Sequence, residues 1–116
     1  MARILLVEDE PNIGGIIVFK LRREGHEVRW LEAGEGLVSE ASQMGADMIL
    51  LDASLPDADP FDLLAGLSPR PVIMLTEFRD AAMAARAQRA GAAAVVEKPF
   101  KPTVLARLVA QLAPVP

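Results

Sequence analysis

The sequence predicts an α/β fold in which helices cover both faces of a parallel sheet. Short apolar runs alternate along the chain with longer and more polar stretches of helical spacing, as expected of repeated strand–helix units. Three of these runs are continuously hydrophobic, which is typical of strands buried on both faces. The chain has 116 residues, of which 52% are hydrophobic, so it is long enough for one core. We therefore expect a single domain over residues 1–116.

Five apolar runs are predicted to form strands, at residues 4–7, 28–31, 48–51, 72–75 and 93–96. The first, third and fourth are continuous blocks of large aliphatic residues and should lie inside the sheet. The second run is mixed and the fifth is rich in alanine. We expect these two to form the sheet edges.

Five helices are predicted between and after the strands, at residues 11–24, 34–43, 61–67, 79–89 and 101–112. Pro11 and Pro102 stand where the first turn of a helix tolerates proline. Glycines suited to a left-handed residue follow three of the helices, at Gly25, Gly45 and Gly91. The pair Gly14–Gly15 costs about 1 kcal/mol per residue relative to alanine, so the first helix is expected to start late or fray at this end.

The composition excludes several classes of function. The chain has no cysteine and a single histidine, His26, which leaves no disulfide framework, cysteine nucleophile or histidine metal cluster. Its net charge is −4 and it has no strong basic cluster, so nucleic acid and membrane surfaces are not expected partners. No apolar run reaches the length of a membrane span, and the first run is too short for a signal peptide. A cytoplasmic location is the default expectation.

Chemically active residues follow four of the predicted strands. In an open α/β sheet, ligands bind beyond the carboxyl ends of the strands, so these residues are expected to converge: Glu8, Asp9 and Glu10, Asp52, Thr76, and Lys98. Clustered carboxylates repel one another, and a hard cation with oxygen ligands, naturally Mg²⁺, makes such a cluster tolerable. One ammonium and one hydroxyl beside that cation would neutralise and orient a phosphoryl group.

This ordered set resembles the receiver domain of two-component response regulators, and the likeness covers essentially the whole chain. The matching segments are the Glu8-Asp9 pair, the run LLDASLP around Asp52, the run VIMLT ending at Thr76, and the triplet beginning at Lys98. The 43 residues from Asp9 to Asp52 and the 22 from Thr76 to Lys98 are also as in the family. Each motif alone is weak, since an isolated acid or threonine commonly caps a helix or turn.

The resemblance implies a flavodoxin-like, doubly wound sheet of five parallel strands in the order 2-1-3-4-5, with five helices. It implies that Asp52 accepts a phosphoryl group from a histidine kinase or a phosphotransfer protein. Glu8, Asp9, Asp52 and the backbone carbonyl of Ala53 would hold Mg²⁺, while Thr76 and Lys98 would contact the phosphoryl oxygens. Such a domain is a phosphoacceptor switch that assists its own phosphotransfer and autodephosphorylation, and not an enzyme in the usual sense.

The resemblance also implies a mode of output. With no output domain visible in the sequence, the signal would pass to a downstream protein partner or to a domain absent from this chain. A homodimer through the face of the fourth helix, fifth strand and fifth helix is a candidate assembly.

The sequence departs from the family pattern near the switch. Val95 stands where an aromatic residue is usual, and β-branching restricts its first side-chain torsion. Glu77 follows Thr76 where a small residue is usual, and its carboxylate would either repel the phosphodonor or pair with Lys98 at rest. The interval of 24 positions from Asp52 to Thr76 is shorter than usual, so the third helix is expected to be short, about two turns.

Three alternatives were weighed against a phosphorylated switch. A pseudo-receiver that acts through phosphorylation-independent protein contacts is the main one, and it draws support from Val95 and Glu77. A flavodoxin-type binder needs a phosphate-cradling loop after its first strand, whereas residues 8–11 are acidic there. A Mg²⁺-dependent phosphohydrolase would want a second acid two residues after its nucleophile, where this chain has Ser54.

Overall fold

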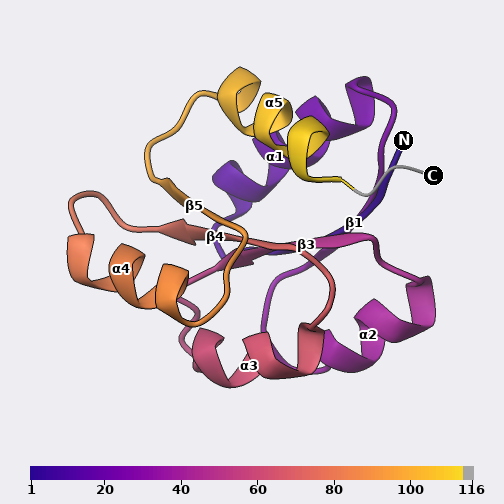
Figure 1. The fold of residues 1–116 in the computed structure, drawn as a ribbon. Helices are drawn as coiled ribbons and strands as arrows, with labels where there is room; N and C mark the ends of the chain where they lie inside the picture. The colour runs from indigo at the N-terminus through magenta and orange to yellow at the C-terminus, as the bar shows by residue number, and fades with distance from the viewer. Residues whose placement is uncertain (114–116) are drawn as a thin grey trace.

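The computed structural model describes residues 1–113, in which strands and helices alternate along the chain (Figure 1). The elements are β1 (Arg3–Val7), α1 (Pro11–Arg23), β2 (Glu27–Leu31), α2 (Leu37–Met44), β3 (Met48–Asp52), α3 (Pro60–Leu67), β4 (Val72–Thr76), α4 (Ala81–Arg89), β5 (Ala94–Glu97) and α5 (Pro102–Leu112). The last three residues of the predicted domain lie outside the described part. Within it, no helix has the length and apolar character needed to cross a membrane.

The sheet is parallel throughout, with the strand order β2-β1-β3-β4-β5. This confirms the flavodoxin-like prediction, and β2 and β5 are the edges as expected. The register pairs Val7 with Leu31, Asp52 with Leu75, and Thr76 with Glu97. The carboxyl ends of neighbouring strands therefore lie at one edge of the sheet, which is where the functional residues were expected.

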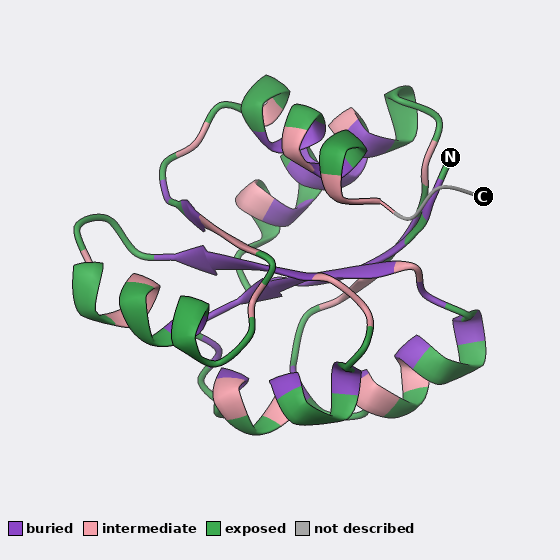
Figure 2. Cartoon of the chain, in the orientation of Figure 1, coloured by how far each residue is buried: buried purple, intermediate pink, exposed green. Residues whose placement is uncertain are grey.

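Helices cover both faces of the sheet. α1 and α5 lie on one face and α2, α3 and α4 on the other (Figure 1), and each layer encloses its own apolar cluster against the strands. The inner strands β3 and β4 are buried at all five positions, because both of their faces meet helices. Figure 2 shows the same arrangement, with buried residues along the strands and exposed residues on the outer sides of the helices.

Two helices begin later than the spacing of apolar residues predicts. α2 starts at Leu37 instead of residue 34, because Gly36 has a left-handed backbone with φ of 76° that ends the preceding loop. α4 starts at Ala81 instead of residue 79, because Arg79 also has a positive φ, 59°. Asp80 then caps α4, its side chain accepting a hydrogen bond of 3.0 Å from the backbone N–H of Met83. The third helix is short, as expected, with eight residues.

The predicted late start of α1 is wrong. The helix is continuous from Pro11, and Gly14 is buried within it. The indole of Trp30 lies against Gly14, where a methyl group would come within 2.1 Å of the ring atom Cζ2. The intrinsic cost of glycine in a helix is thus accepted where the fold needs space for a ring from β2.

Candidate functional site

Three carboxylates meet at the carboxyl edge of the sheet. Glu8 and Asp9 follow β1, and Asp52 is the last residue of the neighbouring strand β3. Each can offer an oxygen such that the three atoms lie within 4.8 Å of one another. Glu8 is 0% and Asp52 1% exposed, whereas Asp9 faces solvent. The predicted acidic cluster is therefore present in the fold, with two of its members withdrawn from water.

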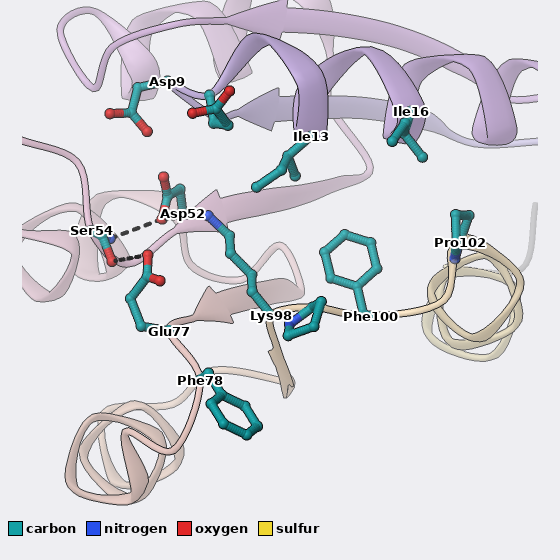
Figure 3. A pocket seen from close by; sticks show the side chains of 12 residues that line it. Asp9, Ile13, Ile16, Asp52, Ser54, Glu77, Phe78, Lys98, Phe100 and Pro102 are labelled. Atoms are coloured by element: carbon teal, nitrogen blue, oxygen red, sulfur yellow. Dashed lines mark hydrogen bonds and ion pairs between the residues drawn. The ribbon is translucent and has the colours of Figure 1, made fainter.

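Lys98 supplies the positive charge of this cluster. Its Nζ lies 2.9 Å from Glu8 Oε1 and 3.3 Å from Asp52 Oδ1. In Figure 3 its side chain extends from the end of β5 toward Asp52. Its backbone N–H donates to the carbonyl oxygen of Thr76 at 2.8 Å, which fixes the point where the side chain leaves the chain. The ammonium thus bridges the two buried acids.

The two oxygens of Asp52 have different surroundings. Oδ1 accepts a hydrogen bond of 2.9 Å from the backbone N–H of Ser54 and is also the oxygen near Lys98. Oδ2 is buried and has no hydrogen-bond partner among the described residues. Buried carboxylate oxygens are seldom left without a partner. The site is therefore incomplete by itself and is suited to a further electropositive group at Oδ2.

Glu77 does not pair with Lys98 as one interpretation of the sequence had it. The Oγ of Ser54 instead donates a hydrogen bond of 3.1 Å to Glu77 Oε1 (Figure 3). Lys98 already has two carboxylate partners in Glu8 and Asp52, whereas Ser54 offers its hydroxyl to Glu77 from the facing loop. Sequence reasoning missed this contact, because a serine in a turn carries no sign of its partner.

Neither Thr76 nor Val95 lines the cleft. Thr76 ends β4, is 1% exposed, and does not line the cavity that contains Asp52 and Lys98. Val95 is half-buried in β5 and packs with the cluster under α3 and α4. Ala53, whose carbonyl the resemblance assigns to the metal, is buried directly after Asp52. Asp52 and Lys98 therefore line the cleft, whereas Thr76 does not.

One wall of the cleft is apolar. The cavity, about 610 Å³ in volume, is lined on this side by Ile13 and Ile16 of α1 and by Phe100 and Pro102 at the start of α5 (Figure 3). Ile13 and Ile16 belong to the apolar stripe of α1, and Ile16 is 53% exposed. Periodicity identifies an apolar stripe but not its outer limit, which here continues past the core onto the rim of the site.

Residues 4–110 match the sequence model of the response regulator receiver domain. The chain belongs to this family. It is a receiver domain of two-component systems, and the resemblance seen in its strand-end motifs is confirmed.

Relatives and solved structures agree with this assignment. The receiver domain is 35% identical to the transcriptional regulatory protein KdpE of Mycobacterium tuberculosis over 103 residues, which is 86% of this chain and 46% of KdpE. It is 33% identical to the DNA-binding response regulator MtrA of Mycolicibacterium smegmatis, covering 95% of this chain and 50% of MtrA. The chain thus spans about half the length of these relatives.

Two solved receiver domains in a BeF3-activated form have the same fold. The DrrB receiver domain gives a TM-score of 0.86 at 28% identity and covers 97% of both chains. The N-terminal receiver domain of Klebsiella pneumoniae RstA gives 0.87 at 26% identity, covering 95% of this chain and 97% of RstA's.

The electrostatics of the receiver site favour binding of a cation. Burial raises the pKa of Asp52, and the neighbouring Glu8 carboxyl raises it further, against the lowering effect of the Ser54 N–H. Burial by itself lowers the pKa of Lys98, but its contacts with Glu8 and Asp52 outweigh burial and raise it. The Lys98 ammonium is therefore favoured in its charged form, while ionisation of Asp52 is costly, and a further positive charge nearby would lower that cost.

Proposed function

We propose that Asp52 accepts a phosphoryl group and that residues 1–116 form one receiver domain that acts as a phosphorylation switch. The observation that carries this proposal is the pairing of Lys98 with Glu8 and Asp52 beside the unpartnered Oδ2 of Asp52. A carboxylate held between a buried ammonium and further acids is suited to a reaction in which charge moves onto phosphoryl oxygens. Residues of the family pattern stand at each of these positions.

The transfer step needs alignment and charge neutralisation more than a strong nucleophile. A carboxylate oxygen of Asp52 attacks the phosphorus of a phosphohistidine, so an O–P bond forms and the N–P bond breaks. The electron pair stays on the imidazole nitrogen of the donor, which then binds a proton. Lys98 follows the phosphoryl oxygens on its flexible side chain, and Thr76 becomes a second ligand if its loop moves toward the cleft. Attack of water on the phosphorus of the acyl phosphate would break its bond to Asp52, release inorganic phosphate and return Asp52 to the free carboxylate.

Glu8, Asp9 and Asp52, with the backbone carbonyl of Ala53, are the proposed ligands of Mg²⁺. Their chemistry fits this ion, because oxygen donors from carboxylates and carbonyls are what a small hard cation prefers. The unpartnered Oδ2 of Asp52 fits it as well. When bound, the ion would neutralise the acids and the incoming phosphoryl group.

The proposed partners follow from the family and from the cleft. A histidine kinase or histidine phosphotransfer protein is the proposed phosphodonor. The output is proposed to pass to a protein partner or to an output domain, as the names of the transcriptional regulators KdpE and MtrA suggest for them. A homodimer through α4, β5 and α5 is one form that this output would take.

A second candidate function is a phosphorylation-independent interaction module. Two features favour it. Glu77 places a carboxylate at the mouth of the cleft through its bond to Ser54, and Val95 replaces the usual aromatic residue of the switch.

Incubation with acetyl phosphate and Mg²⁺, followed by intact mass spectrometry, separates the two functions. The switch predicts the mass of one added phosphoryl group, absent from Asp52→Asn and absent without Mg²⁺. An unmodified wild-type chain, together with no Mg²⁺-dependent response to beryllofluoride, would instead support the interaction module.

A further inference from the structure

Trp30 is tied to the acidic site through the main chain of Glu8. Its indole Nε1 donates a hydrogen bond of 2.9 Å to the Glu8 carbonyl oxygen. The Glu8 N–H donates at 3.0 Å to the carbonyl oxygen of Leu31, the residue after Trp30. The end of β2 therefore holds both backbone polar groups of Glu8.

The hydrogen bond from Trp30 takes the place of a backbone hydrogen bond that β2 no longer supplies. The ladder between β1 and β2 stops at the pair Val7–Leu31, so the backbone of β2 offers no partner of its own to the Glu8 carbonyl. Glu8 is fully buried, and a buried carbonyl without a donor is costly. The indole N–H supplies that donor from a side chain.

The side chain of Glu8 is held as well. Its Oε1 lies 2.9 Å from Lys98 Nζ, and its Oε2 accepts a hydrogen bond of 3.2 Å from the backbone N–H of Glu10. A change at the Glu8 backbone would therefore move both the acid that Lys98 pairs with and the start of the loop that carries Asp9.

Gly14 sets the position of the indole. A Cβ at this position would lie 2.1 Å from Trp30 Cζ2, 2.5 Å from Cε2 and 2.8 Å from Cη2, all far below contact distance. Only glycine leaves room for the ring against α1, so Gly14 and Trp30 form a matched pair. The ring cannot shift toward the helix, and this keeps its N–H aimed at Glu8.

We propose that Trp30 is a positioning residue for the cation at Glu8, Asp9 and Asp52, acting through its indole N–H on the Glu8 carbonyl, with Gly14 as its required counterpart. This inference rests on the proposed Mg²⁺ site. Outer partners of metal ligands affect affinity by orienting the ligand, so loss of the indole donor should weaken Mg²⁺ binding by roughly tenfold. Trp30 is the single tryptophan, so its fluorescence and its one indole N–H resonance report the contact directly.

The test titrates Mg²⁺ into four chains: the wild type, Trp30→Phe, Gly14→Ala, and the double variant Trp30→Phe/Gly14→Ala. Amide shifts of Glu8 and Asp9 give the affinity, and urea unfolding gives the stability. Phenylalanine does not reach the ring atoms nearest Gly14, so the methyl group of the double variant refills that space and should recover stability lost in either single variant. Affinity should remain about tenfold weaker in all three variants, because each lacks or displaces the indole donor.

Val28→Ala is the matched control. Val28 lies in the same strand and is buried in the same apolar cluster, but it makes no contact with Glu8 through a side-chain polar group. It should lower stability and leave Mg²⁺ affinity at the wild-type value. In the wild type, the indole N–H resonance should also shift as Mg²⁺ binds.

The outcomes separate the inference from the function on which it rests. Equal Mg²⁺ affinity in the wild type and in Trp30→Phe would overturn the role of Trp30 alone. Recovery of both stability and Mg²⁺ affinity in the double variant would also overturn it, because packing without the indole donor would then be sufficient for Mg²⁺ binding. A wild-type chain with no Mg²⁺ response would overturn the proposed metal site, and this inference with it.

Discussion

The hydroxyl of Ser54 and the carboxylate of Glu77 join the loops after β3 and β4 at the mouth of the cleft, with 3.1 Å between Oγ and Oε1. Asp52, two residues before Ser54, lines the same cleft. Ser54 also donates its backbone N–H to Asp52 Oδ1. The same short loop therefore touches both the proposed phosphoacceptor and the carboxylate that stands at its entrance (Figure 3). A phosphoryl group arriving at Asp52 would meet a negative charge held in place by a neighbour.

Removal of Glu77 should speed phosphorylation by small anionic donors. We expect Glu77→Ala to react with acetyl phosphate about fivefold faster than the wild type, since a like charge about 4 Å from the donor costs about 1 kcal/mol where water screens the pair, as at the open mouth of a cleft. Glu77→Gln keeps a hydrogen-bond acceptor for Ser54 and loses the charge. Ser54→Ala keeps the charge of Glu77 and removes the hydrogen bond that holds its carboxylate.

The rates of these three variants identify the cause. If the charge of Glu77 limits the reaction, Glu77→Gln should be phosphorylated about as fast as Glu77→Ala. If the hydrogen bond from Ser54 limits it, Ser54→Ala should reach that rate instead. Wild-type rates in all three, measured by time-resolved mass spectrometry, would mean that Glu77 does not restrict the cleft.

Asp52→Asn should abolish the phosphoryl adduct and stabilise the metal-free fold. The pKa of Asp52 is raised by burial and by Glu8, so folding opposes its ionisation. A raised acid pKa means that the wild type loses stability as pH rises from the unfolded value of 3.8 through the folded value. The stability advantage of Asp52→Asn should therefore be absent at low pH and present at neutral pH. Urea unfolding across this range tests it, and a variant less stable than the wild type at neutral pH would contradict it.

Lys98→Ala should have the opposite effect on stability. The two buried acids Glu8 and Asp52 would lose their shared ammonium, and removing one partner of a buried ion pair costs about 3 kcal/mol. Mg²⁺ should restore part of that loss by replacing the positive charge. Lys101→Ala, at an exposed position just before α5, is the control and should change stability by less than about 0.5 kcal/mol. Equal effects of the two substitutions would show that the ion pairs of Lys98 contribute nothing.

Activation should move the loop between β4 and α4 more than it moves Val95. This loop holds Glu77, the 60% exposed Phe78, and Arg79 with its positive φ of 59°, a conformation that costs a non-glycine residue about 1 kcal/mol. Val95 has no ring to bury or expose. Amide shifts with and without beryllofluoride should be largest over residues 76–80. Shifts confined to α1, with this loop unchanged, would place the output face elsewhere.

His26 should titrate below its usual range and link pH to stability. Its Nδ1 accepts a hydrogen bond of 3.0 Å from the backbone N–H of Ala2, and burial lowers its pKa below the usual 6.5. A lowered histidine pKa gives stability that is complete above 6.5 and is lost as pH falls through the folded value. The imidazole signals of this single histidine give its pKa by NMR.

Unfolding at about pH 7.5 and at about pH 5 gives the energetic part of the same prediction. His26→Gln should lose less stability than the wild type between these two values, because it has no proton to gain. An identical pH dependence in both chains would contradict the role of His26.

Most of the architecture could be predicted from the local spacing of apolar residues. Alternation of apolar runs with helical spacing indicates strands and helices regardless of what they pack against, so five of each were predicted with bounds that differ from the structure by a few residues. The edge positions of β2 and β5 followed from their mixed composition. The convergence of Glu8, Asp9, Asp52 and Lys98 also followed, because parallel strands end at one edge of a sheet.

The remaining features depend on contacts between segments that local sequence does not encode. The bond from Ser54 to Glu77 and the indole of Trp30 against Gly14 both arise where two loops or layers meet. The cost assigned to Gly14 from helix propensity was misleading, since propensity takes no account of a ring from another strand. Hydrophobic periodicity is a property of one element, whereas side-chain partners are chosen by packing across elements. The sequence by itself therefore determined that three acids and one lysine reach the site, and only the tertiary structure decided which atoms they contact and that Ser54 binds Glu77 beside them.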